Sequence, residues 1–536
     1  MNNPTKVIDL FAGSGGLGEG FSSYRPDCKQ KFKIAISIEK ERNAHRTLLL
    51  RSLFRQFEHK EIPESYYAFL RGELGANPED ELYHLPEFKA ALVDAHREAQ
   101  QLTLGETSPQ TIYRKIRDVI GNDECVLIGG PPCQAYSLVG RARNSGAKDK
   151  VYSAKEDHRN FLYQEYLKVI AKFQPKVFVM ENVKGILSAK IDGKLIFTSI
   201  IKDLQNPHTA TKVLPDSGRK QHNYKIFSLN AVKEGSGLIE ETEESLNPHD
   251  YIIRTESLGI PQTRHRVIIL GVRDDIASDL GAFERLNLSD ENPTVKNVIS
   301  DLPKLRSRLS KGDDTVAKWR QSIVSISEQT VNKLSEDPLV PDSVYVAFTK
   351  ELNGIHTSPS STGANHGQVK KTPNFDKDIP VELQKWFEDS RLGKYVINHE
   401  SRGHIVGDLH RYLYYSSYAK TINQSPNAKN LPKILWPKHK NFKTGKFADR
   451  FRVQMSKKPG TTVTCHISKD GHYFIHYDPN QCRSLTVREV ARIQTFPDNY
   501  YFVGNRTQQY VQVGNAVPPY LAKQIAAVVE GILSNK

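Results

Sequence analysis

The chain has 536 residues with 38% hydrophobic and 25% charged side chains, which fits a water-soluble globular protein of two or more domains. Five cysteines without zinc-ligand spacing disfavour a disulfide scaffold and a metal site, and the lack of a long apolar run disfavours a membrane span. The net charge of +14 favours a polyanionic partner, and because a strand pattern starts almost at the N-terminus and leaves no room for a signal peptide, we expect a cytoplasmic protein.

The first predicted element is a buried strand at residues 7–11, followed by a glycine-rich turn. Gly13, Gly15 and Gly18 have the Gly-x-Gly-x-x-Gly spacing that is typical of dinucleotide-binding sites. Glu39 follows about 20 residues later, where a carboxylate that binds ribose is expected. By itself this pattern fits NAD, another adenosine cofactor, or a strand-to-helix turn without a ligand.

The runs KIAISI (33–38), ECVLIGG (124–130) and KVFVMEN (176–182) are typical of strands buried on both faces. Between the last two, residues 159–175 carry apolar side chains every three or four positions, which predicts a helix. This alternation predicts a doubly wound α/β sheet over residues 1–274. A polar stretch at about 54–110 (the insertion) interrupts it, and we expect this stretch to be helical.

Residues 275–481 have a different pattern, with frequent proline, lysine and polar loops, and predict a smaller second domain inserted into the first. Within it, residues 460–476 predict two paired strands around a turn at 469–471. The α/β pattern comes back at residues 482–536 (the return segment), which we expect to complete the first domain.

A strongly basic run lies near the end of the second domain. Residues 433–458 contain nine lysines and arginines, a single aspartate and several interleaved aromatic residues. Such a run can be a solvated loop, but the aromatic residues and the basic chain favour a surface that binds nucleic acid. We expect Lys438, Lys440 and Lys443 to contact phosphate groups.

Chemically active side chains follow each predicted strand. Glycines follow the first strand, Glu39 the second, Cys133 the third and Glu181 the fourth. Because ligands bind at the carboxyl ends of the strands in such sheets, we expect these groups to meet at one edge. A cysteine after two prolines, beside a carboxylate, suits nucleophilic attack better than hydride transfer.

Six stretches follow one another along the chain: DLFAGSGGLGEGF, GGPPCQAYS, ENVKG, QTRHRVIILG, RSLTVREVARIQTFPDNY and QVGNAVPP. In this order they resemble the motifs of prokaryotic DNA (cytosine-5) methyltransferases. The resemblance covers about 1–275 and 480–536, and it implies the Rossmann-like fold of methyltransferases that use S-adenosylmethionine, so that this cofactor replaces NAD. It also implies that residues 275–481 form the target-recognition domain.

The resemblance implies a covalent mechanism on a cytosine flipped out of the DNA duplex. The thiolate of Cys133 would add to carbon 6, and Glu181 would contact ring nitrogen 3 and the exocyclic amine. Arg266 would face the base and the cysteine, and Arg264 would support Arg266. Carbon 5 then accepts the methyl group, and a base removes its proton.

The same resemblance assigns the cofactor site to residues 11–17 (the glycine loop), to Glu39 and to the return segment. The family usually has an acidic residue that holds the adenine amino group, and the best match here is Glu106. The candidate cofactor residues are therefore Phe11, Ala12, Gly13, Ser14, Gly15, Gly16, Leu17, Glu39, Glu106, Asn515 and Ala516.

Double-stranded DNA is the expected partner, bound by a monomer that associates with the nucleoid and protects self DNA alongside restriction or other defence proteins. Two alternatives are a cytosine-5 RNA methyltransferase and a DNA-binding module without activity. The long recognition region disfavours the first, and the intact Cys133 and Glu181 disfavour the second. Residues expected to close over the flipped base are Gln134, Ser137, Arg141 and Arg143.

Overall fold

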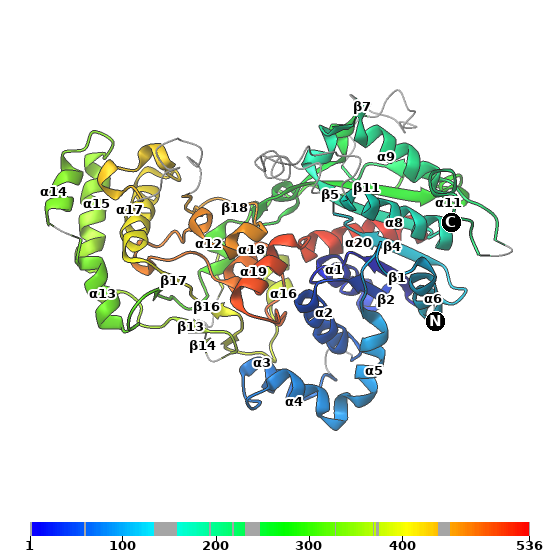
Figure 1. Ribbon diagram of the computed structural model, residues 1–536, viewed down its shortest axis with the longest axis horizontal. Coiled ribbons are helices and arrows are strands. Elements are labelled where there is room, and N and C mark those ends of the chain that lie inside the picture. The colour runs from blue at the N-terminus through cyan, green and yellow to red at the C-terminus, as the bar shows by residue number, and fades with distance from the viewer. Residues whose placement is uncertain are drawn as a thin grey trace.

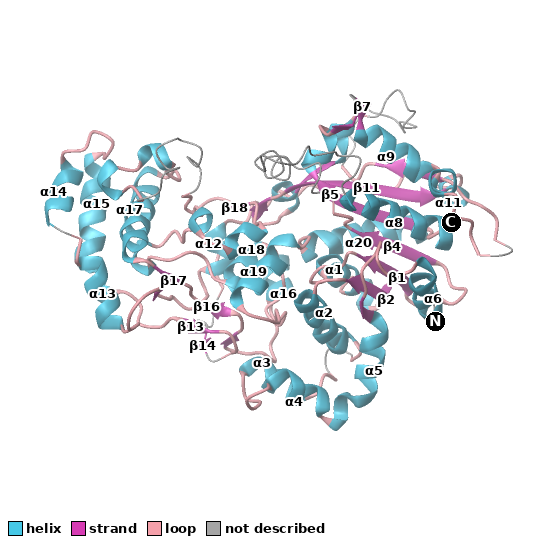
Figure 2. Ribbon diagram, in the orientation of Figure 1, coloured by secondary structure: helices cyan, strands magenta, loops and turns pink. Residues whose placement is uncertain are grey.

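The computed structural model describes residues 3–57, 61–132, 158–191, 194–216, 219–230, 247–326, 328–367, 369–370, 375–437 and 451–534. Figure 1 shows two lobes, one of them built on a large sheet. Figure 2 shows that the long strands gather in that lobe, whereas the other lobe is mainly helical. No helix within the described residues is long and apolar enough to cross a membrane.

The described residues contain an eight-stranded mixed sheet with the order β3-β2-β1-β4-β5-β11-β8, and β9 pairs with β11. β1 is parallel to both β2 and β4, so the strand order reverses there, and β11 runs antiparallel to β5. The predicted doubly wound α/β fold is confirmed. The strands are β1 (Thr5–Leu10), β2 (Phe32–Glu39), β3 (Ala99–Gln101), β4 (Cys125–Gly129), β5 (Val177–Val183), β8 (Tyr224–Phe227), β9 (Ile252–Arg254) and β11 (His265–Arg273).

Helices cover both faces of this sheet because its central strands are apolar on both sides. One face packs against α6, α8 and α9, and the other packs against α1 and α20. Helix α20 belongs to the return segment, so residues from both ends of the sequence share one core. The helices of this lobe are α1 (Gly16–Ser22), α6 (Pro109–Ile120), α8 (His158–Phe173), α9 (Ile196–Gln205), α10 (Pro207–Thr211), α11 (Asp274–Ala277) and α20 (Pro519–Ser534). β6 (Lys190–Ile191) and β7 (Lys194–Leu195) form a short pair.

Most of the insertion lies between β2 and β3 and is helical, as predicted, and its last residues include β3 and the start of α6. It follows α2 (Arg42–Arg55) and contains α3 (Glu64–Arg71), α4 (Pro78–His84) and α5 (Lys89–Glu98). At the bottom of Figure 1 these helices extend from the sheet toward β14 and α16.

The helical lobe surrounds a separate core with Trp319 and several tyrosines of α17. Short strand pairs and four further helices join it to the sheet, and all four of these helices contribute to a common core. The lobe contains α13 (Val316–Val324), α14 (Glu328–Ser335), α15 (Asp342–Asn353) and α17 (Val406–Ile422). The joining helices are α12 (Val295–Ile299), α16 (Val381–Phe387), α18 (Val487–Ile493) and α19 (Arg506–Asn515). The short pairs are β10 (Gln262–Thr263) with β18 (Gly460–Thr461), β12 (Arg308–Leu309) with β17 (Gly403–His404), β13 (Gly363–Ala364) with β16 (His399–Glu400), and β14 (Val369–Lys370) with β15 (Tyr395–Val396).

The hairpin predicted over 460–476 is wrong. Gly471 does adopt a positive φ of 75° at the turn, but short 3₁₀ helices flank it at Cys465–Ser468 and His472–Phe474. The start of the segment bonds to the sheet lobe instead, where Gly460 N donates to the carbonyl oxygen of Pro261. These long-range bonds use the backbone groups that a local hairpin would need.

Candidate active site

The glycine loop connects β1 to α1 at the carboxyl edge of the sheet. Gly13 and Gly15 adopt positive φ angles of 57° and 86°, which glycine accepts without strain, whereas the φ of 56° at Phe11 is uncommon for a residue with a side chain. The backbone N–H of Gly13 donates to Glu39 Oε2 at 2.8 Å, and burial raises the pKa of Glu39. The structure therefore brings the glycine loop and Glu39 together, as predicted.

The return segment encloses the same loop from the other side. Tyr500 donates a hydrogen bond to the backbone oxygen of Ser14, and Ser14 Oγ donates to the backbone oxygen of Gln512 at 3.3 Å. A Cβ atom on Gly16 would collide with the carbonyl of Val517. Only glycine allows these two backbones to lie so close together. This explains why residue 16 is glycine, although the Gly-x-Gly-x-x-Gly spacing does not require glycine at that position.

Space for a ligand remains above the loop, because a Cβ atom on Gly13 would meet no atom within 4 Å. A nearby carboxylate and this open space suit a cofactor with an amino acid end and a ribose. The loop and Glu39 therefore fit S-adenosylmethionine as well as they fit other adenosine ligands.

The remaining predicted cofactor residues are placed less uniformly. Ala516 is buried where α19 ends, but Asn515 and Glu106 are exposed, and Glu106 lies in a turn beyond β3. The residue that the β2–β3 register places beside Glu39 is Gln101. Sequence reasoning missed Gln101 because β3 has only three residues and no apolar pattern.

Glu181 and Arg266 meet at the carboxyl edge of β5. Register pairs Glu181 with Ile268, so Arg266 lies two residues along β11, and its Nε is 2.9 Å from Glu181 Oε1. Burial lowers the pKa of Arg266, while Glu181 opposes this shift. Gly130 leaves room for the carboxylate, because a Cβ there would lie 3.1 Å from Glu181 Oε2.

Arg264 has a different environment from Arg266. It is only 2% exposed, and its Nη1 donates to the carbonyl oxygens of Val463 at 2.8 Å and Gly514 at 3.4 Å. Burial, reinforced by Arg266, holds the pKa of Arg264 well below its ordinary value. Arg264 thus joins the strand that carries Arg266 both to the segment 275–481 and to the return segment.

Cys133 lies outside the described residues, as do Gln134, Ser137, Arg141, Arg143, Lys438, Lys440 and Lys443. The described chain reaches Pro132, and Asn182 Nδ2 donates to the carbonyl oxygen of Pro131 at 3.2 Å. Asn182 is buried next to Glu181. It ties the carboxyl end of β5 to the backbone two residues before Cys133, a role that its place in ENVKG did not reveal.

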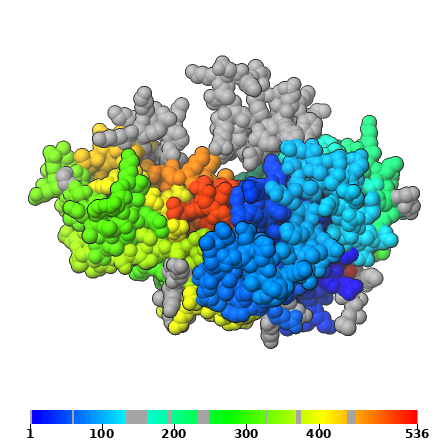
Figure 3. All heavy atoms as spheres, turned by 60° about the horizontal axis from the view of Figure 1, so that its bottom comes forward, coloured from blue at the N-terminus to red at the C-terminus, as the bar shows by residue number. Residues whose placement is uncertain are grey.

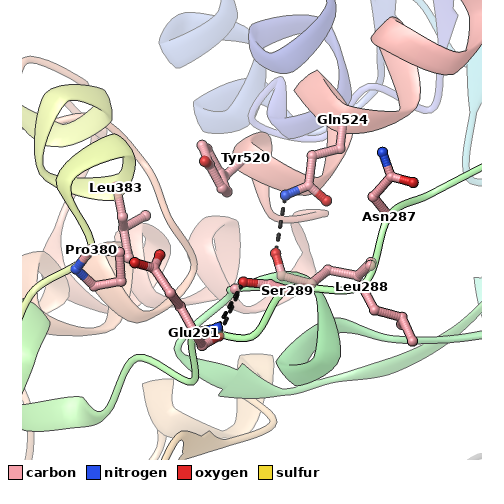
Figure 4. Close-up of a pocket in the computed structure, with 10 residues that line it drawn as sticks. Asn287, Leu288, Ser289, Glu291, Pro380, Leu383, Tyr520 and Gln524 are labelled. Carbon is pink, nitrogen blue, oxygen red and sulfur yellow. Dashed lines mark hydrogen bonds between the residues drawn. The ribbon is translucent and has the colours of Figure 1, made fainter.

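Two other features of the described surface are separate from this edge. A cavity of about 220 Å³ lies between α20 and residues 287–291, and Figure 4 shows the side chains that line it. This cavity shares no residue with the sheet-edge site. His222, Asp274 and Asp275 form a cluster with metal-ligand chemistry, but Arg273 already pairs with Asp275. His222 Nδ1 lies 2.6 Å from Asp274 Oδ1, so these groups form an ion-pair network.

Known proteins are similar to most or nearly all of this chain. The family model described as C-5 cytosine-specific DNA methylase matches residues 104–207 and 242–531. The type II methyltransferase M.Bpa9945I of Bacillus paralicheniformis is 33% identical, covering 98% of this chain and 99% of the relative. The DNA (cytosine-5-)-methyltransferase M.ApeKI of Aeropyrum pernix is 26% identical, covering 77% of this chain and 82% of the relative. The type II methyltransferase M.AgeI of Thalassovita gelatinovora is 24% identical over 99% of this chain and 100% of the relative.

Proposed function

The chain belongs to the C-5 cytosine-specific DNA methylase family and is a DNA (cytosine-5-)-methyltransferase, and we propose that it methylates a cytosine flipped out of duplex DNA. S-adenosylmethionine is the proposed methyl donor. The observation that carries the proposal is the pairing of Glu181 with Arg266 at the edge that also holds the glycine loop. A carboxyl group and a guanidinium side by side can recognise the polar edge of cytosine and balance charge that develops on its ring.

The glycine loop and Glu39 are the proposed holders of the cofactor, with Ala516 at the wall of the same pocket. When bound, S-adenosylmethionine supplies an electrophilic methyl group. Gly13 and Glu39 already hydrogen-bond to each other at 2.8 Å, so the loop is preorganised before the cofactor arrives. The contribution of the chain is to orient the donor toward the end of β4.

Cytosine carbon 5 is a poor nucleophile, and the proposed role of Cys133 is to activate it. The sulfur would form a bond to carbon 6 while the carbon 5–carbon 6 double bond opens. Carbon 5 would then bond to the methyl carbon as the bond from that carbon to the sulfonium sulfur breaks, which leaves a neutral thioether. A base would take the proton from carbon 5, the double bond would form again, and the bond between carbon 6 and the Cys133 sulfur would break, so that the thiolate is regenerated.

Glu181 and Arg266 have complementary proposed roles in this cycle. Glu181, protonated in the complex, donates to ring nitrogen 3 while the thiolate adds, which neutralises the ring. Arg266 is close enough to stabilise the Glu181 carboxylate that remains once the proton has passed to ring nitrogen 3. Its positive charge also favours the thiolate form of a neighbouring cysteine. Asn182 would hold the backbone that leads to Cys133.

Recognition of the DNA sequence is proposed for residues 275–481 and chemistry for residues 1–274 and 482–536. A flipped cytosine at the sheet edge leaves the flanking bases outside the reach of the sheet lobe, so another part must contact them. Lys438, Lys440 and Lys443 would bind phosphate. We further propose a cytoplasmic, nucleoid-associated monomer that protects self DNA alongside restriction or other defence proteins, a role that fits its similarity to type II methyltransferases.

Transfer of labelled methyl groups to duplex DNA tests the proposal. The wild-type protein should label DNA, and Cys133→Ser should bind DNA and cofactor without labelling it. DNA that contains 5-fluorocytosine should trap a denaturation-resistant adduct at Cys133, because fluorine cannot leave as a proton. Labelling of RNA but not of duplex DNA, or full activity of Cys133→Ser, would contradict the proposal.

A further inference from the structure

The insertion shares one hydrophobic core with two segments that are far away in the sequence. Tyr66 and Leu70 of α3 belong to this buried cluster. The cluster also contains Leu392 and Ile397 of residues 275–481 (the recognition region) and Tyr501 of the return segment. In Figure 3 the insertion (azure) lies directly against the yellow-green and red parts of the molecule. The insertion is thus packed between the sheet lobe and the recognition region.

Asp389 is the polar joint of this contact. Its carboxylate is buried, and Oδ2 accepts hydrogen bonds from Tyr67 at 2.9 Å and from Asn499 Nδ2 at 2.6 Å. Oδ1 accepts from the backbone N–H of Arg391 at 2.9 Å. One carboxylate of the recognition region therefore binds the insertion and the return segment together.

A second set of contacts surrounds this joint. Arg391 donates to the carbonyl oxygen of Ile62 at 2.6 Å, and its guanidinium lies 4.3 Å from the centre of the Tyr67 ring. Gly367 N donates to the carbonyl oxygen of Leu70 at 2.9 Å, and a Cβ on Gly367 would lie 3.0 Å from the Arg71 Cα. The backbones of α3 and the recognition region therefore touch without room for adjustment.

The same network continues to the cofactor loop. Arg51 of α2 donates to Asn499 Oδ1 at 3.1 Å and forms a buried ion pair with Glu19, at 2.5 Å between Nη2 and Oε1. Glu19 lies on α1, directly after the glycine loop. Three hydrogen-bonded steps therefore lead from Asp389 to the helix that begins at the candidate cofactor site.

We propose that the insertion is a brace that holds the recognition region in the orientation needed for DNA methylation, with Tyr67 and Asp389 as positioning residues. The proposal rests on the DNA methyltransferase activity of the family. Neither residue lies at the sheet-edge site, so neither is a catalytic residue. If the brace loosens, only a fraction of molecules has the competent orientation, and the apparent affinity for DNA falls by that fraction.

Tyr67→Phe is the sharpest test, because it removes one oxygen and leaves the ring in the core. Tyr83→Phe is its matched control, since the Tyr83 hydroxyl lies in the same insertion, is buried, and has no hydrogen-bond partner among the described residues. Steady-state methylation of unmethylated genomic DNA, thermal unfolding and calorimetry with S-adenosylmethionine should be compared. We expect Tyr67→Phe to raise KM for DNA about ten-fold with kcat nearly unchanged, the result for a smaller competent fraction.

Asp389→Asn is the second variant. An amide oxygen at the Oδ2 position can still accept from Tyr67 and Asn499, but the NH2 group then faces the backbone N–H of Arg391, which is also a donor. We therefore expect a larger rise in KM than for Tyr67→Phe. Equal KM values for Tyr67→Phe, Asp389→Asn and Tyr83→Phe, with only a lower unfolding temperature in the first two, would overturn the brace. A wrong assignment of the chemistry is distinguishable, because it would remove methyl transfer from the wild-type protein itself.

Discussion

Two groups of buried arginines in this chain have opposite bonding patterns. Around α18, every guanidinium nitrogen of Arg483 and Arg492 donates a hydrogen bond. The acceptors of Arg492 are the carbonyl oxygen of Val298 and the carboxylates of Asp301 and Asp498. At the sheet edge, Arg264 keeps an Nε without a hydrogen-bond partner among the described residues. Within the described residues, the polar partners of the Arg266 guanidinium are the Glu181 carboxylate and the carbonyl oxygen of His265.

We interpret this difference as a division of roles, in which the arginines around α18 stabilise the fold and those at the sheet edge keep donors for the proposed chemistry. A buried charge with every bond filled is costly to disturb and has nothing left to offer a ligand. A buried charge with spare donors lowers stability, but it can bind groups that arrive with a substrate. Substitutions in the two groups should therefore affect different measurements.

Glu181→Gln should have the largest effect, on activity alone. Removing the acid that serves the ring nitrogen should lower kcat by about 10²–10⁴-fold, because the amide cannot give up a proton. Glu256→Gln is the control, since Glu256 pairs with His265 at 2.7 Å on the neighbouring strand position. Methyl-transfer rates and melting temperatures should be measured together. An unfolding defect that matches the activity loss would place Glu181 in the stabilising group.

Arg492→Met should have the next largest effect, on stability. It leaves Asp301 and Asp498 buried without their cation, and such losses destabilise proteins by about 3–5 kcal/mol. The control is Arg97→Met, because Arg97 and Asp94 form an exposed pair and such pairs contribute at most about 1 kcal/mol. Denaturant unfolding measures both. Equal stability of the two variants would contradict the stabilising role assigned to the arginines around α18.

Glu39→Ala should weaken the binding of S-adenosylmethionine by about 1.5–3 kcal/mol, the range for hydrogen bonds to a charged group. Calorimetry of the purified protein measures this change. Glu124→Ala is the control, because Glu124 pairs with Arg273 just before β4, at the opposite edge of the sheet. Tight binding of NAD, with none of the sulfonium cofactor or its demethylated product, would reverse the assignment.

Asp9 gives the last expected effect, which depends on pH. It is fully buried behind Gly18 of α1, no described side chain hydrogen-bonds to it, and burial raises its pKa to about 8. The folded state therefore keeps a proton that the unfolded state releases near its ordinary value. The stabilisation is complete below about pH 4 and is lost as pH rises toward 8, by up to about 1.4 kcal/mol per pH unit.

Urea unfolding of the wild-type protein and of Asp9→Asn between pH 5 and 8 checks this expectation. The variant cannot ionise at that position, so the difference between the two stabilities should change across this range. If the stabilities of the two proteins change with pH in parallel, Asp9 is already charged in the folded protein and the expectation is wrong.

The sequence predicts the sheet and much of its edge because those signals are local. Continuous apolar runs mark the strands, and motif order assigns Glu181, Arg266 and Glu39. Gln101 escaped because a three-residue strand has no periodicity. The contact between Tyr67 and Asp389 escaped because 322 positions separate the two residues, and neither lies in a motif. The failed hairpin at 460–476 has the same cause, since long-range bonds replaced a local pairing.

The enclosure of the glycine loop has a consequence for synthesis on the ribosome. Tyr500 reaches the Ser14 carbonyl across 486 positions of sequence. At roughly 5–20 residues per second, that partner emerges roughly half a minute to a minute and a half after the loop. During that interval the loop lacks its outer wall, so a nascent chain cannot hold cofactor as the finished protein does. Methylation by this chain therefore starts only after translation has passed the residues that close the loop.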